Sequence, residues 1–190
     1  MCGRERNPLA VIGVHGVETM VKKVFHLYEG GVEQYPVRGV VLSNVLFASL
    51  LVAGTAACWL IAPEFGIVYL VVFSALTYAV LRRLTCTRCH YFGKRCGSGW
   101  GLLASMWCSR RPIEEFNDSP GVRLAPLVYG LMILVPLFAL GILLAQHATT
   151  TPLLLLALLI SLAFYSAGPG RRRACAVCRM RLFCKGSAAR

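Results

Sequence analysis

The chain has 190 residues, which is enough for one domain or at most two small ones. Hydrophobic residues make up 57% of it, whereas about 45–50% is usual for soluble globular proteins. The formal net charge is +12, but the charges are segregated from long uncharged runs, and nothing resembles a reading helix or a base-stacking platform. The composition therefore excludes an ordinary soluble domain, and we expect no nucleic-acid partner.

Residues 1–39 are predicted to form an N-terminal segment that lies on the membrane surface. Apolar residues recur in it at helical spacing, which predicts an interfacial amphipathic helix. These residues are Val17, Met20, Val21, Val24, Phe25 and Tyr28. Glu29-Gly30-Gly31 is expected to end this helix, and Pro36 leads into the first span.

Four runs contain no Asp, Glu, Lys or Arg. They are residues 40–62, 65–81, 124–146 and 149–167. A bilayer core of about 30 Å needs about 20 apolar residues in a helix, with about 17–25 tolerated. We therefore expect an all-α integral membrane protein with four transmembrane helices, arranged as one helical hairpin at residues 40–81 and a second at 124–167.

The basic residues predict the orientation of these helices. Residues 1–39 hold five Lys and Arg, residues 82–123 hold eight and residues 168–190 hold seven, while the other two connections hold none. The positive-inside rule places such basic segments in the cytoplasm. We expect a multi-pass protein in the lipid bilayer with both termini and the central loop on the cytoplasmic side.

The central loop, residues 82–123, is expected to have two parts. Residues 86–101 are dense in Cys, Gly and basic residues, which favours turns and knuckles over regular structure. Trp100, Leu103 and Trp107 then recur at helical spacing, which predicts a second interfacial helix that ends near Cys108.

Six of the nine cysteines form two clusters of the same pattern. They are Cys86, Cys89 and Cys96 after the second run, and Cys175, Cys178 and Cys184 after the fourth. Each cluster has a basic pair, a C-x-x-C motif, a further cysteine and a glycine, so we predict an internal repeat of hairpin plus cluster. Parallel repeats sit about an axis along the membrane normal, which would bring both clusters to one side.

The clusters are candidate metal sites, because the cytoplasm is reducing and disfavours structural disulfides. A C-x-x-C pair places two thiolates on one turn, and two pairs complete a tetrahedral four-sulfur zinc site. We predict zinc as the cofactor, and neighbouring Arg and Lys are expected to lower the pKa of the thiols. The candidate ligands are Cys86, Cys89, Cys175 and Cys178, with Cys96 and Cys184 as further ligands and His90 or Cys108 available in the first half.

Other interpretations of the cysteines stay open. An iron–sulfur cluster or a pair of exchanging dithiols would make a redox protein that passes electrons to a membrane partner. The clusters could also be a docking site for soft-metal transport. Juxtamembrane thiols can instead be palmitoylated, for which Cys2 and Cys108 are the better candidates. Cys58, alone within the first span, is expected to be a small core residue.

Four spans with a cysteine-rich loop between the second and third resemble the layout of the protein palmitoyltransferases. Those enzymes carry an Asp-His-His-Cys motif, whereas this loop offers only Cys89-His90, so their activity is not expected. No charged residue lies within a span, and the sequence contains no catalytic grouping. The predicted function is a non-enzymatic membrane module that binds metal and presents a basic surface to a protein partner.

Overall fold

The computed structural model describes residues 27–146 and 149–189. These residues form helices and turns, with no strand among them. Four helical rods are long and apolar enough to cross a membrane: Val37–Trp59, Pro63–Arg88, Ile113–Gln146 and Thr150–Ala176. The all-helical class and the four helices of spanning length are therefore confirmed. Cys2 and most of the predicted N-terminal interfacial helix lie outside the described residues.

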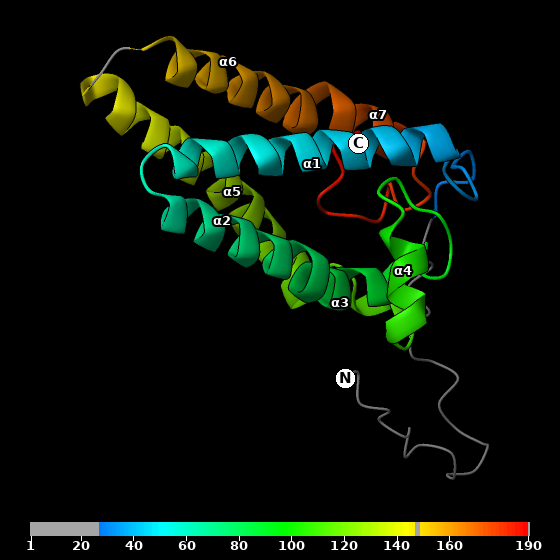
Figure 1. Ribbon diagram of the computed structural model, residues 1–190. Helices are drawn as coiled ribbons and strands as arrows, with labels where there is room; N and C mark the ends of the chain where they lie inside the picture. Colours follow the sequence, from blue (N-terminus) through cyan, green and yellow to red (C-terminus); the bar gives the residue numbers. More distant parts are fainter. Residues whose placement is uncertain (1–26, 147–148, 190) are drawn as a thin grey trace, which may run out of the picture.

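Helices α1 (Val37–Trp59) and α2 (Pro63–Ala75) form the first hairpin. Pro63 is the first residue of α2, a position where its missing N–H would have no partner within the helix anyway. The short connection between the two helices lies at the opposite end of the molecule from the cysteine-bearing segments (Figure 1).

The second rod does not end with α2. It continues through a π-helical segment, η1 (Leu76–Leu81), and the short helix α3 (Arg82–Thr85) into the 3-10 turn η2 (Cys86–Arg88). The rod therefore ends within the first C-x-x-C motif.

The central loop contains two further helical elements. Helix α4 (Trp100–Trp107) is followed by the 3-10 turn η3 (Ile113–Glu115). Trp100 is buried against Phe47, while Trp107 is exposed, so only one of the two tryptophans faces outward from the chain.

The second hairpin consists of α5 (Pro120–Gln146) and α6 (Thr150–Tyr165). The fourth rod continues from α6 through a π-helical segment, η4 (Ser166–Gly170), into α7 (Arg171–Ala176). The end of α5 and the start of α6 lie at the same end of the molecule as the connection between α1 and α2 (Figure 1).

The second and fourth helices extend beyond residues 81 and 167, where the sequence predicted the spans to end. An apolar run marks the part of a helix that suits hydrocarbon, and it does not mark where the helix itself stops. Basic residues such as Arg83 and Arg173 are favourable near a helix C-terminus because of its partial negative charge. Each helix therefore carries its basic residues out to the neighbouring cysteines.

Helix α1 packs against α2, α5 and α6, and α5 also packs against α6. The core is formed by apolar side chains from all four rods. Ala57 and Cys58 of α1, Leu140 of α5 and Leu159 of α6 are fully buried in it, and Tyr69 and Phe73 of α2 add aromatic rings. Cys58 is therefore a core residue, as expected.

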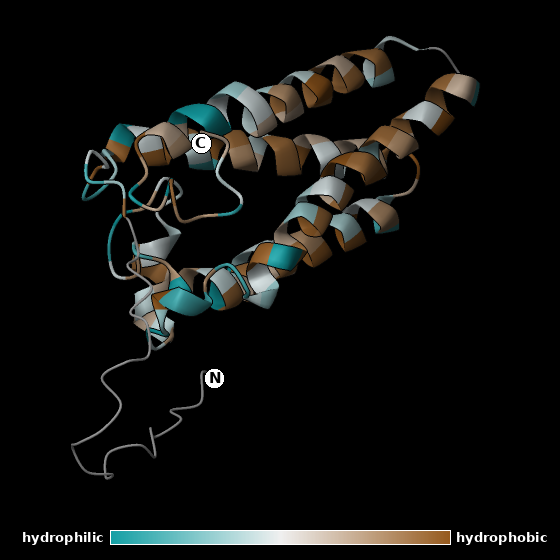
Figure 2. Cartoon of the chain, turned by 180° about the vertical axis from the view of Figure 1, so that it is seen from behind, coloured by the Kyte–Doolittle hydropathy of each residue, from teal (hydrophilic) through white to brown (hydrophobic). Residues whose placement is uncertain are grey.

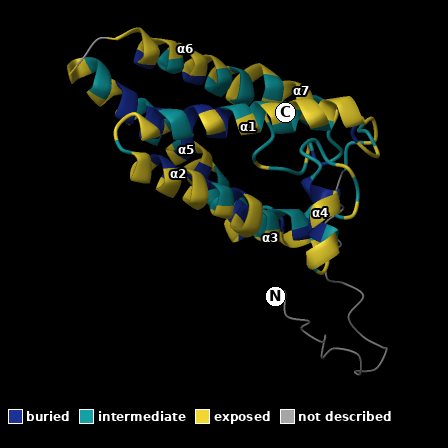
Figure 3. Cartoon of the chain, viewed as in Figure 1, coloured by how far each residue is buried: buried dark blue, intermediate teal, exposed yellow. Residues whose placement is uncertain are grey.

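Much of the remaining helix surface is both apolar and exposed, above all on α6 (Figure 3). Hydrophobic residues dominate the rods, whereas hydrophilic residues gather at the end that carries the cysteines (Figure 2). Water cannot solvate so much apolar helix surface at an acceptable free energy, and lipid can. The four rods therefore imply contact with the lipid bilayer.

Gly54 allows the first hairpin to pack closely. Tyr69 of α2 is buried, and its hydroxyl donates a 2.6 Å hydrogen bond to the backbone carbonyl of Met132 in α5. A Cβ at residue 54 would overlap the Tyr69 phenol, so the glycine is what lets the ring pass α1.

We expect Gly54→Ala to lower the thermal unfolding midpoint of the protein in detergent, because overpacking costs about 1–3 kcal/mol. The loss should exceed the gain of about 1 kcal/mol that alanine brings to a helix. Gly141→Ala in α5 is the matched control, since its added Cβ meets nothing within 4 Å. Equal midpoints for the two variants would contradict the close passage of Tyr69.

Candidate functional site

Three segments that are far apart in the sequence meet at the cysteine-bearing end. We call residues 28–36, ahead of α1, the strap. Residues 86–108 are the first knuckle and residues 175–187 the second knuckle. Together they form a cap over one end of the helices (Figure 1).

Both knuckles begin with the same backbone turn. The amide of Cys89 donates to the carbonyl of Cys86 at 3.2 Å, and the amide of Cys178 donates to that of Cys175 at 3.1 Å. The carbonyl of the second cysteine in each motif then accepts a hydrogen bond from the amide three residues further on, at 3.1 Å for Cys89 and 3.0 Å for Cys178. The two C-x-x-C motifs therefore have matching backbone geometry.

Backbone amides also reach the sulfur atoms in both knuckles. The backbone amide of Tyr91 donates a hydrogen bond to the sulfur of Cys89, and that of Met180 donates one to the sulfur of Cys178. In each case the amide belongs to the residue two positions after the cysteine. A hydrogen bond donated to sulfur favours the thiolate over the thiol. Each knuckle thus has a donor placed to stabilise negative charge on the second cysteine of its motif.

The third cysteine of the first knuckle is held by a tight loop. Cys96 Sγ accepts a hydrogen bond from the amide of Gly101 at 3.3 Å. Gly93 and Gly99 have φ of +77° and +75°, a left-handed conformation that favours glycine. These two glycines let the chain turn back so that Cys96 returns toward the C-x-x-C motif.

The same order of helical elements precedes both knuckles. An apolar helix leads into a π-helical segment (η1 or η4) and then into a short basic helix (α3 or α7). The first cysteine directly follows α3 in one half and lies near the end of α7 in the other. The internal repeat itself stays a prediction, but the two halves deliver their cysteines in the same way.

The two knuckles contact each other directly through sulfur. The thiol of Cys89 donates to Met180 Sδ, with the two sulfur atoms 3.3 Å apart. The amide of His90 donates to the same thioether at 3.2 Å. Met180 is almost completely buried, so the tip of the second knuckle is inserted against the first.

The strap forms hydrogen bonds with both knuckles. The amide of Val32 donates to the carbonyl of Val177 at 2.9 Å, and the carbonyl of Val32 accepts the hydroxyl of Tyr91 at 2.8 Å. Three residues along, the amide of Tyr35 donates to the carbonyl of Arg95 at 2.9 Å. A single extended segment therefore connects the two cysteine-bearing loops.

Two tyrosines fill the space between the strap and the knuckles. The rings of Tyr35 and Tyr91 meet edge-on with their centroids 5.5 Å apart, and the hydroxyl of Tyr35 donates to the carbonyl of Ala174 at 2.7 Å. The thiol of Cys178 lies within hydrogen-bond reach of both hydroxyls. Burial raises the pKa of Tyr91 to about 12 and that of Tyr35 further, so both are neutral phenols.

Glu33 of the strap makes an ion pair with each knuckle. It binds Lys94 of the first knuckle at 3.1 Å and Arg179 of the second. The hydrogen bond from Lys94, followed by the charge of Arg179, lowers the pKa of the Glu33 carboxyl below its ordinary value of 4.5. The carboxylate is therefore charged at neutral pH.

The C-terminal part of the second knuckle is held by the connector that follows α4. The side-chain amide of Asn117 donates to the carbonyl of Phe183 at 2.8 Å, and its oxygen accepts the amide of Lys185 at 2.9 Å. This two-point contact fixes the backbone on either side of Cys184.

The expectation that neighbouring basic residues lower the pKa of the thiols is wrong for the cysteines beyond the helix ends. Burial raises the pKa of Cys89, Cys178 and Cys184 above its ordinary value. Removing a thiolate from water costs more free energy than its attraction to nearby cations restores. Much of the basic charge is moreover engaged elsewhere, as when Arg88 binds Glu115 at 3.1 Å.

Among the described residues, no three His, Cys, Asp or Glu side chains come close enough together to hold a metal ion. Cys89 interacts electrostatically with Cys86 and Cys96 of its own knuckle and with Cys178 of the other. The predicted thiols are therefore neighbours that do not converge on one point. The six-cysteine ligand set stays a prediction, and a bound ion would have to draw these thiols inward.

The two further candidates for the first half differ in position. Cys108, which follows α4, interacts electrostatically with Cys86. His90 instead interacts with Lys94, Arg179 and Glu33, and burial lowers its pKa so that the ring is neutral. Cys108 is thus the better placed of the two to join a thiol set.

Sequence reasoning missed Met180 and the strap residues that line the cap. Met180 could have been noticed as a further sulfur-containing residue of the second cluster, two residues after Cys178. Tyr35 and Glu33 gave no signal, because they stand outside both clusters and lack a motif.

No family model matches the chain, and neither a curated protein nor a solved structure does so. Function is therefore inferred from the cap itself.

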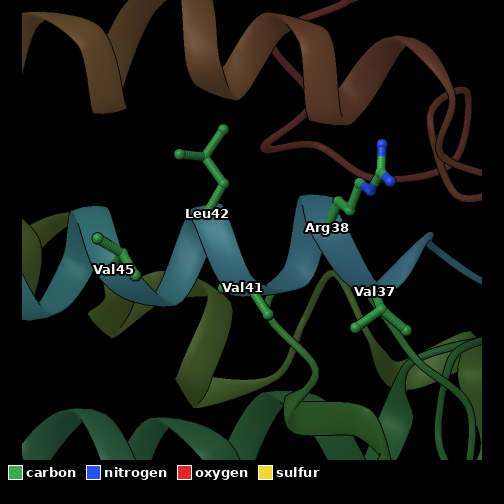
Figure 4. A pocket seen from close by; sticks show the side chains of 5 residues that line it. All are labelled: Val37, Arg38, Val41, Leu42 and Val45. Carbon is green, nitrogen blue, oxygen red and sulfur yellow. The ribbon is translucent and has the colours of Figure 1, made fainter.

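Two apolar hollows of the described surface do not compete with the cap as a functional site. A shallow groove along the start of α1 is lined by four aliphatic side chains and Arg38 (Figure 4). A second hollow, beside α5, is lined only by apolar residues. Both belong to the apolar surface that the bilayer covers.

We expect Glu33→Gln to loosen the cap at neutral pH, because the variant keeps the side-chain size but loses both ion pairs. Hydrogen exchange of residues 28–36 and 177–181 should become faster than in the wild type. Glu114→Gln, a charge for which the described residues show no ion pair, is the matched control.

The pH dependence of this effect follows from the lowered pKa of Glu33. A depressed carboxyl pKa stabilises the folded state above its unfolded value, and that contribution is lost as the pH falls through the folded value. The difference between Glu33→Gln and wild type should therefore disappear well below pH 4.5. A difference that persists at acid pH would show that the ion pairs are not its cause.

Proposed function

We propose that this protein is a non-enzymatic membrane module whose cap binds zinc through its paired C-x-x-C motifs and presents a basic cytoplasmic surface to a protein partner. The observation that carries the proposal is that two knuckles with the same backbone turn are held against each other by one strap. Zinc would then join the ends of the two hairpins.

The thiol chemistry is compatible with a zinc site. Zinc binds thiolates, so it must displace the protons that burial keeps on Cys89 and Cys178. The amides of Tyr91 and Met180 already point at these sulfurs and would stabilise the anions that result. Because protons are released, zinc affinity should rise with pH.

Two observations support a cytoplasmic position for the cap. The basic residues of the described chain are gathered at the cap end, and the two short connections at the other end carry none in their described residues. The positive-inside rule places such a basic end in the cytoplasm, where a reducing environment keeps thiols available for metal.

An iron–sulfur or dithiol redox protein is the second candidate. Cys96 and Cys184 exceed what one four-thiolate zinc site needs, and three or four cysteines can hold an iron–sulfur cluster. Soft-metal transport is less well supported, because residues 40–62, 65–81 and 124–146 of the described spans contain no Asp, Glu, Lys or Arg.

Metal content separates these candidates. We expect wild-type protein, purified without oxygen or chelators, to carry about one zinc ion per chain and to be colourless. Cys86→Ser combined with Cys175→Ser should remove the zinc and lower the thermal unfolding midpoint. Cys58→Ala, which changes a cysteine of the core, should keep the zinc. Iron, sulfide and visible absorption would instead establish the redox candidate, and full zinc content in the double variant would refute the proposed ligands.

Labelling with a membrane-impermeant maleimide tests the orientation. Glu64→Cys places a thiol at the end opposite the cap, and Leu182→Cys places an exposed one in the second knuckle. In intact cells, Glu64→Cys should gain one label relative to wild type, whereas Leu182→Cys should gain one only after permeabilisation. The reverse result would place the cap outside the cytoplasm.

A further inference from the structure

We propose that Cys89 and Met180, with Cys178, form a soft-metal site between the two knuckles and that this site takes Cu(I). The inference deepens the proposed function, on which it rests because it assigns a metal to the same cap. It shares Cys89 and Cys178 with the zinc site, but it differs in the metal and adds the thioether of Met180, which the zinc site does not use.

The sulfur atoms of Cys89 and Met180 are already neighbours, 3.3 Å apart across the boundary between the knuckles. Met180 has only 2% of its surface exposed. Its Sδ accepts two hydrogen bonds, one from the thiol of Cys89 and one from the amide of His90 at 3.2 Å. The thioether is therefore buried and oriented toward Cys89.

A third sulfur is available from the second knuckle. Cys178 interacts electrostatically with Cys89 and lies two residues before Met180. The described residues hold no group of three His, Cys, Asp or Glu suited to a metal, whereas Met180 adds a thioether beside the thiol of Cys89. Two thiols and a thioether make an all-sulfur set, which is the donor chemistry that Cu(I) prefers.

The binding step balances in bonds and protons. When Cu(I) binds, the S–H bonds of Cys89 and Cys178 break, two sulfur–copper bonds form, and two protons leave to water, while Met180 contributes a neutral thioether. The site then carries one negative charge, and the backbone amides of Tyr91 and Met180, which donate to the sulfurs of Cys89 and Cys178, stabilise it.

The test is a competition titration of the full-length protein in detergent without oxygen. Cu(I), kept reduced with ascorbate, is divided between the protein and a coloured Cu(I) chelator, and zinc binding is measured in parallel. We expect Met180→Leu to lower the affinity for Cu(I) about 10–100-fold, at least as much as loss of an outer-shell partner, while zinc binding is unchanged. Met106→Leu, at an exposed methionine of α4, should leave both unchanged.

Two further variants make the outcome decisive. Met180→Cys restores a sulfur and should recover Cu(I) binding, which would exclude a folding defect as the cause of the loss. The Cys86→Ser and Cys175→Ser double variant should lose zinc but keep Cu(I), since neither residue belongs to the copper set. Wild-type affinity for Cu(I) in Met180→Leu, or no Cu(I) binding by the wild type, would overturn this inference and leave the zinc measurement to decide the proposed function alone.

Discussion

The hydrogen bonds of the strap are the interaction on which the cap depends. The amide of Val32 donates a hydrogen bond to the second knuckle, and its carbonyl accepts one from the first. Glu33 adds an ion pair with each knuckle. Neither knuckle contains a strand or long helix of its own that could align it with the other. The strap supplies this alignment, and Pro36 then passes directly into α1. The position of the cysteines is thus coupled to the start of the first rod.

The fold was largely predictable from the sequence, whereas the interior of the cap was not. Apolar runs and basic segments follow from the free energy of transferring residues into a bilayer, which is a local property of the chain. The C-x-x-C turns are local too. The placement of Tyr35, Glu33 and Met180 is not local, because their partners are 61 to 146 residues away along the chain. The prediction that the thiol pKa values are lowered was wrong for the same reason, because burial depends on how the whole chain packs.

Each of the two hairpins contributes one half of the cap. Each brings a π-helical segment, a short basic helix and one knuckle. The sulfur atoms that lie closest across the boundary come from different hairpins, Cys89 from the first and Met180 from the second. Neither hairpin carries the site alone, so metal chemistry at this boundary would depend on how the two hairpins are packed in the bilayer.

The long sequence separation across the cap has a consequence for biogenesis. Tyr35 and Ala174, which share a hydrogen bond, are 139 residues apart, and contacts of such long range form late in folding. During synthesis the first knuckle emerges while the third and fourth helices are still to be made and inserted. Its thiols remain open to solvent, oxidants and chaperones throughout that interval. Burial of Cys89 against Met180 therefore marks the moment at which the nascent chain has completed its assembly.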